Sequence, residues 1–456
     1  MLASLGQRFS SFFRATVPDP FVIAVLLTFL TFTLAVTLTD TSPAQLVDSW
    51  AGNEGVWKFL GFSMQMCLIL VTGHALASSP PVARIIRALA DIPRSPAQAA
   101  ALIAFVAATL GVLNWGLGLV GGALIARDVG RSLERRGIRA HYPLLAASGY
   151  VGLLVWHGGF SGTAPLKVST HAEIADILPG IALEPIGLEQ TILSPLNLLV
   201  TGGLILIAPI VMAMLTPKRT DDMQPASAFV SIEDEKPSAP ERDKPMLPRL
   251  LEDTPVVSLA LVALIGWWAW RYYIPASGRS GVYNLTPNTV NLTMLMLGLV
   301  CHGTPVRYAR AIEHASRGCA GIILQFPLYA GIMGMMHASG LTEMFASALS
   351  DASNATTLPI FTFASAGVLN IFVPSGGGQW GVQGPIAIRS ALDAGVDVPK
   401  MVMAVAYGDQ LTNMLQPFWA LPLLAITGAK ARDIVGYTAL LMLIAAVWVV
   451  GCLLVM

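Results

Sequence analysis

The stretch Gly111-Val112-Leu113-Asn114 returns about half a chain later as Gly367-Val368-Leu369-Asn370. Each copy lies in an apolar stretch, and a glycine-rich segment follows each one. Three further matches keep the same order: Met64-Gln65-Met66 with Leu324-Gln325-Phe326, Arg131-Ser132 with Arg389-Ser390, and Tyr150 before Pro165-Leu166 with Tyr407 before Pro422-Leu423. One short match arises easily by chance, but four matches at almost one displacement indicate an internal repeat.

The composition is that of a membrane protein. Of the 456 residues, 54% are hydrophobic and only 12% are charged, and the mean hydropathy is +0.65. Soluble domains carry about 25% charged residues, so we expect a polytopic protein whose main partner is the lipid bilayer. The net charge is zero and no basic patch is interleaved with aromatic residues. Nucleic acid is therefore not an expected partner.

The cysteines and the N-terminus exclude two further classes. The four cysteines lie in or beside apolar stretches and show no CxxC spacing, so neither a disulfide framework nor a zinc site is expected. We expect no cofactor and no metal other than a coupling ion. About twenty residues precede the first apolar run, which is long enough to cross a bilayer. We interpret this run as a retained first span rather than a cleaved signal peptide.

Nine stretches have the length and composition of a transmembrane helix, which needs about 20 apolar residues. They are 21–39, 58–77, 143–166, 194–216, 255–275, 286–302, 319–338, 401–427 and 433–453. Two other apolar stretches, 97–126 and 358–388, are too long for one span, and glycines interrupt both near the middle.

Arginines predict how these two long stretches enter the membrane. The first is flanked by Arg84, Arg87 and Arg94 before it and by Arg127, Arg131, Arg135, Arg136 and Arg139 after it. Because Lys and Arg stay on the cytoplasmic side, both ends of 97–126 should lie there, as in a re-entrant hairpin. No Lys or Arg occurs between Arg317 and Arg389, so 358–388 should enter from the outer face.

This topology predicts an all-α polytopic membrane protein with about nine transmembrane helices plus two re-entrant hairpins in two inverted repeats. The N-terminus is expected to be cytoplasmic and the C-terminus periplasmic. The domain organisation is a first repeat at 1–216, a solvated cytoplasmic linker at 217–254, an extra span at 255–275 that permits the inversion, and a second inverted repeat at 276–456.

The breaks in the hairpins and in spans 143–166 and 401–427 are the candidate sites, because backbone leaves the helix at membrane depth only inside protein or beside a wet cavity. Half-helix N-termini attract anions, and unwound carbonyls can hold cations. The substrate-binding candidates are Asn114, Gly116, Gly118, His157, Ser161, Thr163, Asn370, Ser375, Gly376, Gly377, Gly378, Gln379 and Asn413. The candidates for binding a coupling Na+ or H+ are Asn114, Asn370, Asp409, Thr412 and Asn413.

Each candidate also has a structural interpretation. Glycines in membrane bundles often serve close helix packing, and buried amides often join helices. A carboxylate at the bilayer centre costs roughly 2.5 to 3.5 kcal/mol and so faces a cavity or a partner; for Asp409 the partner could be His157. His157 could bind a carboxylate or relay a proton, or be a core histidine whose hydrogen bonds are satisfied.

Six stretches of the chain resemble the bacterial short-chain fatty acid transporter family. They begin at Phe62 (FSMQM), Asn114 (NWGLGLVGG), His157 (HGGFSGTAP), Leu324 (LQFPLYAGI), Val373 (VPSGGGQW) and Tyr407 (YGDQLTN). The resemblance implies uptake of small monocarboxylates such as butyrate and acetoacetate across the bacterial inner membrane. It also implies kinship with the ion transporter superfamily, whose members use paired hairpins and an elevator-like movement, and which often form dimers; a homodimer is therefore one expected assembly.

One departure from that superfamily concerns the coupling ion. The Ser-Asn-Thr hairpin-tip motif of the related dicarboxylate carriers is absent as such, and Asn114 and Pro374-Ser375 replace it only in part. Symport is expected, but the sequence leaves sodium and proton coupling open.

The residues themselves favour a small monocarboxylate. An acyl chain needs an apolar wall, which Trp156, Phe160, Trp380, Phe418 and Trp419 could supply. Apart from Lys167, just beyond the first break, no Lys or Arg lies in the middle of a span, whereas a dicarboxylate or a phosphate favours a buried cation.

Two other functions remain open from the sequence. One is a carrier of the same architecture for dicarboxylates or amino-acid conjugates. The other, more remote, is an intramembrane serine protease, because Gly159-Phe160-Ser161-Gly162 matches a GxSG motif with His157 nearby. A duplicated inverted architecture argues against an enzyme.

Overall fold

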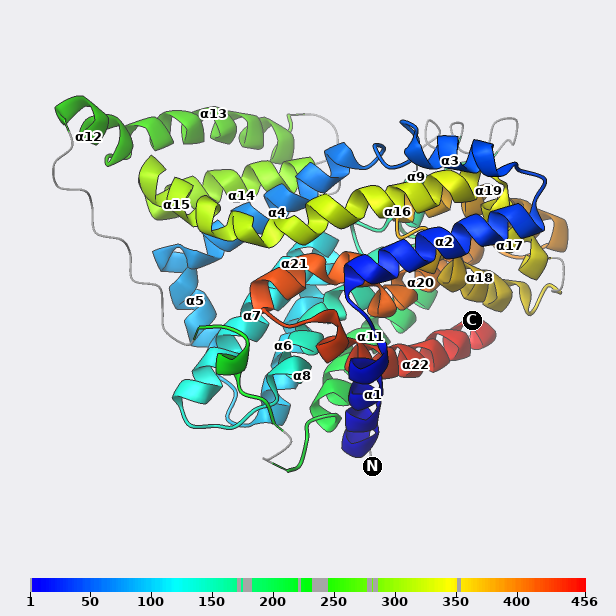
Figure 1. The fold of residues 1–456 in the computed structure, drawn as a ribbon, viewed down its shortest axis with the longest axis horizontal. Helices are drawn as coiled ribbons and strands as arrows, with labels where there is room; N and C mark the ends of the chain where they lie inside the picture. Colours follow the sequence, from blue (N-terminus) through cyan, green and yellow to red (C-terminus); the bar gives the residue numbers. More distant parts are fainter. Residues whose placement is uncertain are drawn as a thin grey trace.

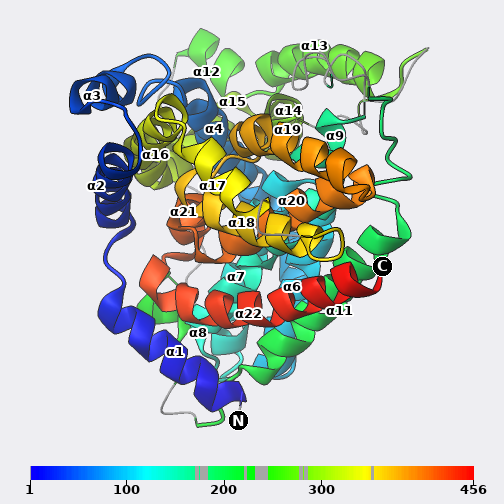
Figure 2. The same cartoon turned by 90° about the vertical axis from the view of Figure 1, so that its right-hand side faces the viewer.

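The computed structural model describes residues 2–169, 174, 183–219, 223–231, 245–276, 281, 286–350 and 354–456. Every regular element in these ranges is a helix. Figures 1 and 2 show long helices surrounding a centre of shorter and broken ones. The expected all-α polytopic membrane fold is confirmed.

The first half and the connection to the second contain the following elements. They are α1 (Leu2–Thr16), α2 (Pro20–Leu38), α3 (Pro43–Ala51), α4 (Leu60–Ser78), α5 (Pro80–Ala90), α6 (Pro96–Leu113), α7 (Trp115–Arg135), α8 (Tyr142–Gly149), η1 (Tyr150–Leu154), η2 (Trp156–Gly158), α9 (Thr163–Lys167), α11 (Pro195–Met214), η4 (Ala226–Ala228), α12 (Met246–Glu252) and α13 (Val256–Tyr273).

The second half has a similar order of long, short and broken helices. Its elements are α14 (Pro287–His302), α15 (Pro305–Ser316), η6 (Arg317–Cys319), α16 (Ala320–Ala338), α17 (Leu341–Ser350), α18 (Leu358–Phe372), α19 (Gly376–Ala394), α20 (Val398–Thr412), η7 (Asn413–Leu415), α21 (Pro417–Thr427) and α22 (Ala431–Val455).

Seven helical segments of the described chain are long and apolar enough to cross a membrane. They are Pro20–Leu38, Leu60–Ser78, Pro96–Leu113, Pro195–Met214, Met246–Tyr273, Pro305–Ala338 and Ala431–Val455. The predicted spans 143–166 and 401–427 are broken, as their glycines, prolines and polar residues indicate. The predicted span 286–302 forms only the 16-residue α14. The number of crossings therefore stays a prediction.

Both long apolar stretches fold as two helices joined by a short break. In the first, α6 ends and α7 begins around Asn114. In the second, Val373, Pro374 and Ser375 separate α18 from α19. The two helices of each pair pack against each other. Their entry from opposite faces of the membrane stays a prediction.

A glycine at the contact between hairpin and broken span permits close backbone packing in each half. A Cβ atom at Gly111 would lie 2.3 Å from the Gly152 carbonyl oxygen. In the second half Gly367 lies against Gly408, where a Cβ atom would be 2.2 Å from the Phe363 carbonyl oxygen. A helix can approach this closely only where a side chain is absent. Each hairpin therefore packs directly onto the broken span that follows it.

Contacts between the halves are reciprocal. Helix α2 packs on α16 while α14 packs on α4, and α3 packs on α16 while α15 packs on α4. Within each half, α5 packs on α7 and α17 packs on α19. This exchange of partners is what a two-fold related duplication would produce.

Part of the linker is hydrogen-bonded to the first half. The Tyr142 N–H donates to the Gln224 carbonyl at 2.8 Å, and the Ser227 N–H and hydroxyl both donate to Glu134. A cavity of about 410 Å³ lies beneath this segment, between the end of α7 and Pro225. Residues 223–231 thus contact the first half while most of them stay at least partly exposed, and 232–244 lies outside the described residues. The solvated linker at 217–254 stays a prediction.

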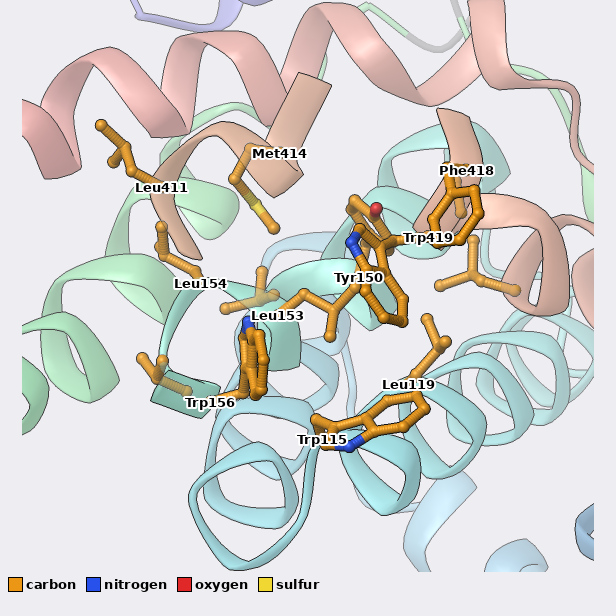
Figure 3. Packing of buried hydrophobic residues seen from close by; sticks show 14 of the residues in the cluster. Trp115, Leu119, Tyr150, Leu153, Leu154, Trp156, Leu411, Met414, Phe418 and Trp419 are labelled. Carbon is orange, nitrogen blue, oxygen red and sulfur yellow. The ribbon is translucent and has the colours of Figure 1, made fainter. Parts of the chain in front are cut away.

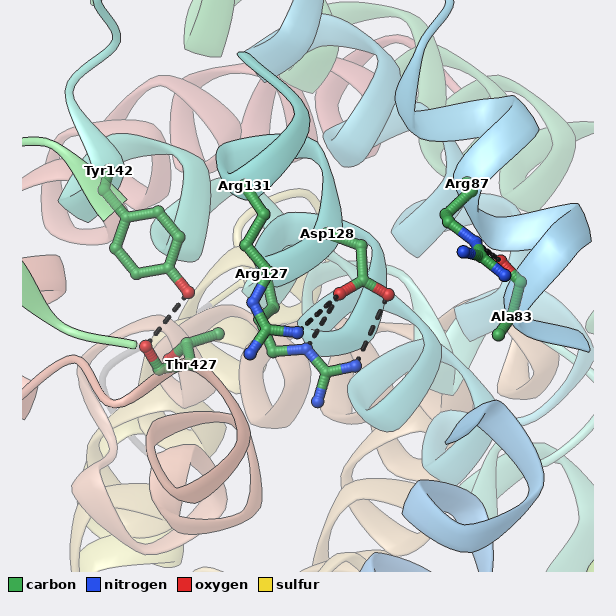
Figure 4. A network of polar contacts seen from close by, with 7 residues as sticks. All are labelled: Ala83, Arg87, Arg127, Asp128, Arg131, Tyr142 and Thr427. Carbon is green, nitrogen blue, oxygen red and sulfur yellow. Dashed lines mark hydrogen bonds and ion pairs between the residues drawn. The ribbon is translucent and has the colours of Figure 1, made fainter. Parts of the chain in front are cut away.

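Polar contacts lie within the last turns of α7 and between α8 and α21 (Figure 4). Asp128 accepts from the Arg127 Nε at 2.9 Å and forms an ion pair with Arg131 at 3.6 Å. The Tyr142 hydroxyl donates to the Thr427 carbonyl at 3.0 Å. The Tyr142 contact ties the start of the first broken span to the last part of the second.

Candidate functional site

The first hairpin tip is closed by its own asparagine. Asn114 has extended backbone, and its side-chain oxygen accepts from the Gly116 N–H at 2.9 Å and the Leu117 N–H at 3.3 Å. The Gly118 N–H donates to the Asn114 carbonyl, and a Cβ atom at Gly118 would lie 2.6 Å from the Gly111 Cα. Gly116 and Gly118 thus present no free N–H group in this conformation. Asn114 Nδ2 is buried and has no hydrogen-bond partner in the described chain.

The first broken span docks onto this tip because its glycines allow contact with backbone. A Cβ atom at Gly159 would lie 2.2 Å from the Val112 carbonyl oxygen, and the Phe160 N–H donates to that oxygen at 2.8 Å. The Ser161 hydroxyl oxygen accepts from the Trp115 N–H at 3.0 Å. Ser161 therefore positions the tip.

His157 joins the first broken span to α20. Its N–H donates to Gln410 Oε1 at 3.0 Å, and its Nδ1 lies 3.2 Å from the Ala406 carbonyl oxygen. Its Nε2 is buried with no hydrogen-bond partner in the described ranges. The Gln410 side chain thus holds the His157 backbone, and no hydrogen bond or ion pair joins His157 to Asp409 among the described residues.

The second hairpin tip meets the same broken span. The Ser375 hydroxyl accepts from the Gly378 N–H at 3.2 Å and so caps α19. A Cβ atom at Gly376 would lie 2.7 Å from His157 Nε2 and 2.9 Å from Thr163 Oγ1. Gly377 is exposed, with no atom of another residue closer than 4.0 Å to its Cβ position. Both tips therefore converge on residues 156–163.

Asn370 occupies a different place from Asn114, which corrects the expectation of an asparagine at both breaks. It lies inside α18, before the break at Val373, and is fully buried. Its Nδ2 lies 2.9 Å from the Asp409 carbonyl oxygen, 3.0 Å from Thr412 Oγ1 and 2.7 Å from Asn413 Oδ1. The cause is Pro374, which, together with Ser375, moves the break further along the chain.

Gln379 and Asp409 have contrasting surroundings. Gln379 donates to the Ala366 carbonyl and to Gln383 Oε1, both at 2.9 Å, so it joins the two helices of its hairpin. Asp409 is only 2% exposed. No hydrogen bond or ion pair reaches its carboxyl group from the described part of the chain.

Two tyrosines connect the broken spans across the halves. The Tyr150 hydroxyl contacts the carbonyl oxygens of Asn413 and Gln416, at 2.9 and 3.1 Å. The Tyr407 hydroxyl donates to Asn197 Oδ1 at 3.1 Å, and Asn197 Nδ2 donates to the Gly158 carbonyl at 2.8 Å. The sequence pairs Tyr150 with Tyr407 as repeat residues but does not indicate these roles, nor those of Asn197 and Gln410.

An aromatic group lies beside the tips (Figure 3). The ring centroids of Trp115 and Trp419 are 5.3 Å apart, and Trp156 lies 6.5 Å from Trp115 and 6.4 Å from Trp419. Phe418 stacks on Phe326 at 3.9 Å. Of the predicted apolar wall, Trp156, Phe418 and Trp419 belong to this group. Trp380 packs on Gly384 of its own helix, and Phe160 is half-buried.

The geometry gives no support to serine hydrolysis. The Ser161 oxygen accepts from Trp115, and no described histidine hydrogen-bonds to Ser161. Among the described residues no group of three or more His, Cys, Asp or Glu side chains could hold a metal ion.

Sequence comparison identifies the family. The model of the family described as "Short chain fatty acid transporter" matches residues 1–456. The chain belongs to the short-chain fatty acid transporter family. This family membership makes the protein a multi-pass membrane transporter and not an enzyme.

Two relatives match over nearly their full lengths. A protein of Escherichia coli (strain K12), provisionally named a short-chain fatty acid transporter, is 42% identical over 97% of each chain. A protein of Haemophilus influenzae (strain ATCC 51907 / DSM 11121 / KW20 / Rd) with the same provisional name is 38% identical over 99% of each chain.

Two solved transporters are more distant matches. The Alcanivorax borkumensis YdaH transporter has a TM-score of 0.45 at 16% identity, covering 96% of this chain and 97% of its own. Neisseria gonorrhoeae MtrF, from a class of antimetabolite efflux pumps, has a TM-score of 0.43 at 16% identity, covering 98% and 97%.

Proposed function

We propose that this transporter takes up butyrate- and acetoacetate-like monocarboxylates across the bacterial inner membrane. The observation that carries the proposal is a surplus of buried hydrogen-bond donors where the two tips meet. Asn114 Nδ2, Trp156 Nε1 and Trp419 Nε1 have no partner in the described chain. Buried polar groups without partners cost about 1 to 3 kcal/mol each, so a carboxylate that accepts from them would be stabilised.

The charge around these donors favours one carboxylate over two. No Lys or Arg occurs from residue 140 to 166 or from 401 to 429. A dicarboxylate would bring a second negative charge into a buried region without a compensating cation. The aromatic group supplies the apolar surface that a short acyl chain requires.

We also propose that uptake is coupled to a cation held near Asn370. Three oxygens surround its side-chain nitrogen: the Asp409 carbonyl oxygen, Thr412 Oγ1 and Asn413 Oδ1. The nitrogen and oxygen of a side-chain amide are nearly equal in size, so a half-turn would place a fourth oxygen there. Four neutral oxygens suit a hard cation such as Na+, and the nearby Asp409 carboxyl group offers H+ an alternative place to bind.

The transport movement is proposed to be of the elevator type in two inverted repeats. The reciprocal packing of α2 on α16 and of α14 on α4 supports this arrangement. The arginines at the end of α7 support a cytoplasmic location for that end and for the N-terminus. A homodimer in the membrane belongs to the same proposal.

Uptake into proteoliposomes tests the function. Labelled butyrate and acetoacetate would be followed under an inward sodium gradient, an inward proton gradient, both and neither, with succinate as competitor. We expect accumulation of both monocarboxylates under at least one gradient and little inhibition by succinate. Stronger inhibition by succinate than by unlabelled butyrate would replace the monocarboxylate with a dicarboxylate.

A further inference from the structure

The rings beside the tips carry polar groups that the structure leaves unused. Trp156 is 4% exposed and Trp419 is 5% exposed. Within the described chain, neither indole N–H has a hydrogen-bond acceptor. Trp448, by contrast, donates its indole N–H to the Val200 carbonyl at 3.2 Å. A buried indole normally finds such a partner. Trp50 and Trp380 also lack one in the described chain, but of these four residues Trp156 and Trp419 are the two whose rings contact each other, which indicates a shared missing acceptor.

The two unpaired indoles face a common region. Their ring centroids are 6.4 Å apart. In Figure 3, the nitrogens of Trp156 and Trp419 lie on the sides of their rings that face Leu153 and Met414. Trp156 belongs to the first broken span, and Trp419 belongs to α21 of the second. One acceptor between these rings would therefore bind both broken spans.

A second pair of rings closes this region on another side. Trp115 opens α7 at the first tip, 5.3 Å from the Trp419 ring. Phe62 of α4 lies 6.5 Å from Trp115 and 6.1 Å from Trp419, and it stacks on Phe326 of α16 at 5.8 Å. Phe62 carries no polar side-chain atom and Trp115 only one, so these two rings offer a largely apolar boundary.

We infer that the indole N–H groups of Trp156 and Trp419 bind the substrate carboxylate, and that the rings of Trp115 and Phe62 limit its acyl chain length. This inference rests on the proposed monocarboxylate transport. A carboxylate can accept from two N–H groups at once, one for each oxygen. Its chain then extends along the Trp115 ring until Phe62 of α4 blocks further carbons. The first pair of residues sets affinity for every carboxylate, whereas the second pair sets which chain lengths fit.

Binding is tested on the full-length protein without a transport assay. Tryptophan labelled with 15N in the indole ring would be incorporated, and butyrate titrated into the detergent-solubilised protein while indole N–H resonances are recorded. The variants Trp156→Phe and Trp419→Phe assign the two signals. We expect these two signals to move with butyrate, while the Trp448 signal and all signals titrated with 1-butanol stay in place. Unmoved Trp156 and Trp419 signals at saturating butyrate would overturn the carboxylate assignment.

Transport by the same variants separates the two roles. Trp156→Phe and Trp419→Phe each remove a hydrogen bond to a charged group, so we expect KM to rise roughly tenfold or more. The rise should be the same for propionate, butyrate and hexanoate. The control Trp448→Phe should keep the wild-type KM. Phe62→Ala and Trp115→Ala should move the preferred substrate from butyrate toward hexanoate or octanoate, and the control Phe9→Ala, in α1, should leave it unchanged.

The outcomes distinguish this inference from the proposed function. If the wild type accumulates butyrate but the Phe62 and Trp115 variants keep its chain-length preference, the size limit is wrong. If the wild type accumulates no short-chain acid, the proposed function fails, and the indole resonances still decide whether a carboxylate binds. Melting temperatures of the purified variants show whether each one folds.

Discussion

Gly376 of the second hairpin tip lies against His157 of the first broken span. A Cβ atom at Gly376 would be 2.7 Å from His157 Nε2, closer than real side chains pack. The same tip exposes Gly377, whose Cβ position has no neighbouring residue nearer than 4.0 Å. Two adjacent glycines thus differ in how much space surrounds them.

Gly376→Ala should reduce butyrate uptake at least tenfold while the protein still folds, because the added methyl group separates the tip from His157 and Thr163. Gly377→Ala is the matched control and should keep uptake within about twofold of wild type. Initial uptake rates measure the effect on transport, and melting temperatures show whether both variants fold. Equal uptake by the two variants would show that the tip need not contact the broken span.

Gly111→Ala and Gly408→Ala should each destabilise the protein by about 1 to 3 kcal/mol, the usual cost of overpacking. The physical reason is the approach of a new methyl group to backbone, at 2.3 Å from the Gly152 oxygen and 2.2 Å from the Phe363 oxygen. Gly61 and Gly451 have nothing within 4 Å of a Cβ position, so their alanine variants serve as controls. Thermal unfolding in detergent measures the difference, and melting temperatures at or above those of the controls would contradict it.

Asp409→Asn should abolish accumulation against a gradient but retain exchange of labelled for unlabelled butyrate. The amide keeps the shape of the carboxyl group and removes the charge that attracts a coupling cation. Counterflow and gradient-driven uptake, measured on the same proteoliposomes, separate the two effects. Undiminished gradient-driven uptake would return Asp409 to a structural role.

Single cysteines introduced at the two hairpin tips should be accessible to thiol reagents from opposite sides of the membrane. Gly118, although part of the first hairpin, is buried against Gly111 and cannot accept a side chain; Leu113 is 46% exposed and is a better position. In a chain whose native cysteines are replaced, Leu113→Cys and Gly377→Cys should react with membrane-impermeant thiol reagents from opposite faces. Reaction of both from one face is incompatible with inverted hairpins.

The sequence predicted the helical class, the breaks inside the two long apolar stretches and both broken spans, because apolar length and interrupting Gly and Pro are local signals. Its candidate residues did come together where His157, Thr163 and Gly376 meet. Asn114 and Asn370 look equivalent in sequence, yet one caps a helix and the other lies inside one. That difference depends on Pro374, which shifts the second break relative to the first.

Other parts of the site carry no local signal. Gln410 holds the His157 backbone and Asn197 holds the Gly158 carbonyl, and both contacts join residues far apart in the chain. The unpaired indole groups could not be predicted from the sequence either, since Trp156 and Trp419 look like ordinary apolar residues until their neighbours are known. Partners of this kind depend on tertiary packing, which periodicity and composition do not specify.

Through the tyrosine contacts, each half stabilises the broken span of the other half. Tyr150 reaches backbone oxygens of the second broken span, and Tyr407 supports the first through Asn197. Half a chain, expressed alone, would contain an unwound segment without the residues that hold it in shape. Sequence changes in one half therefore constrain those tolerated in the other, and neither half is expected to keep the shape of its broken span alone.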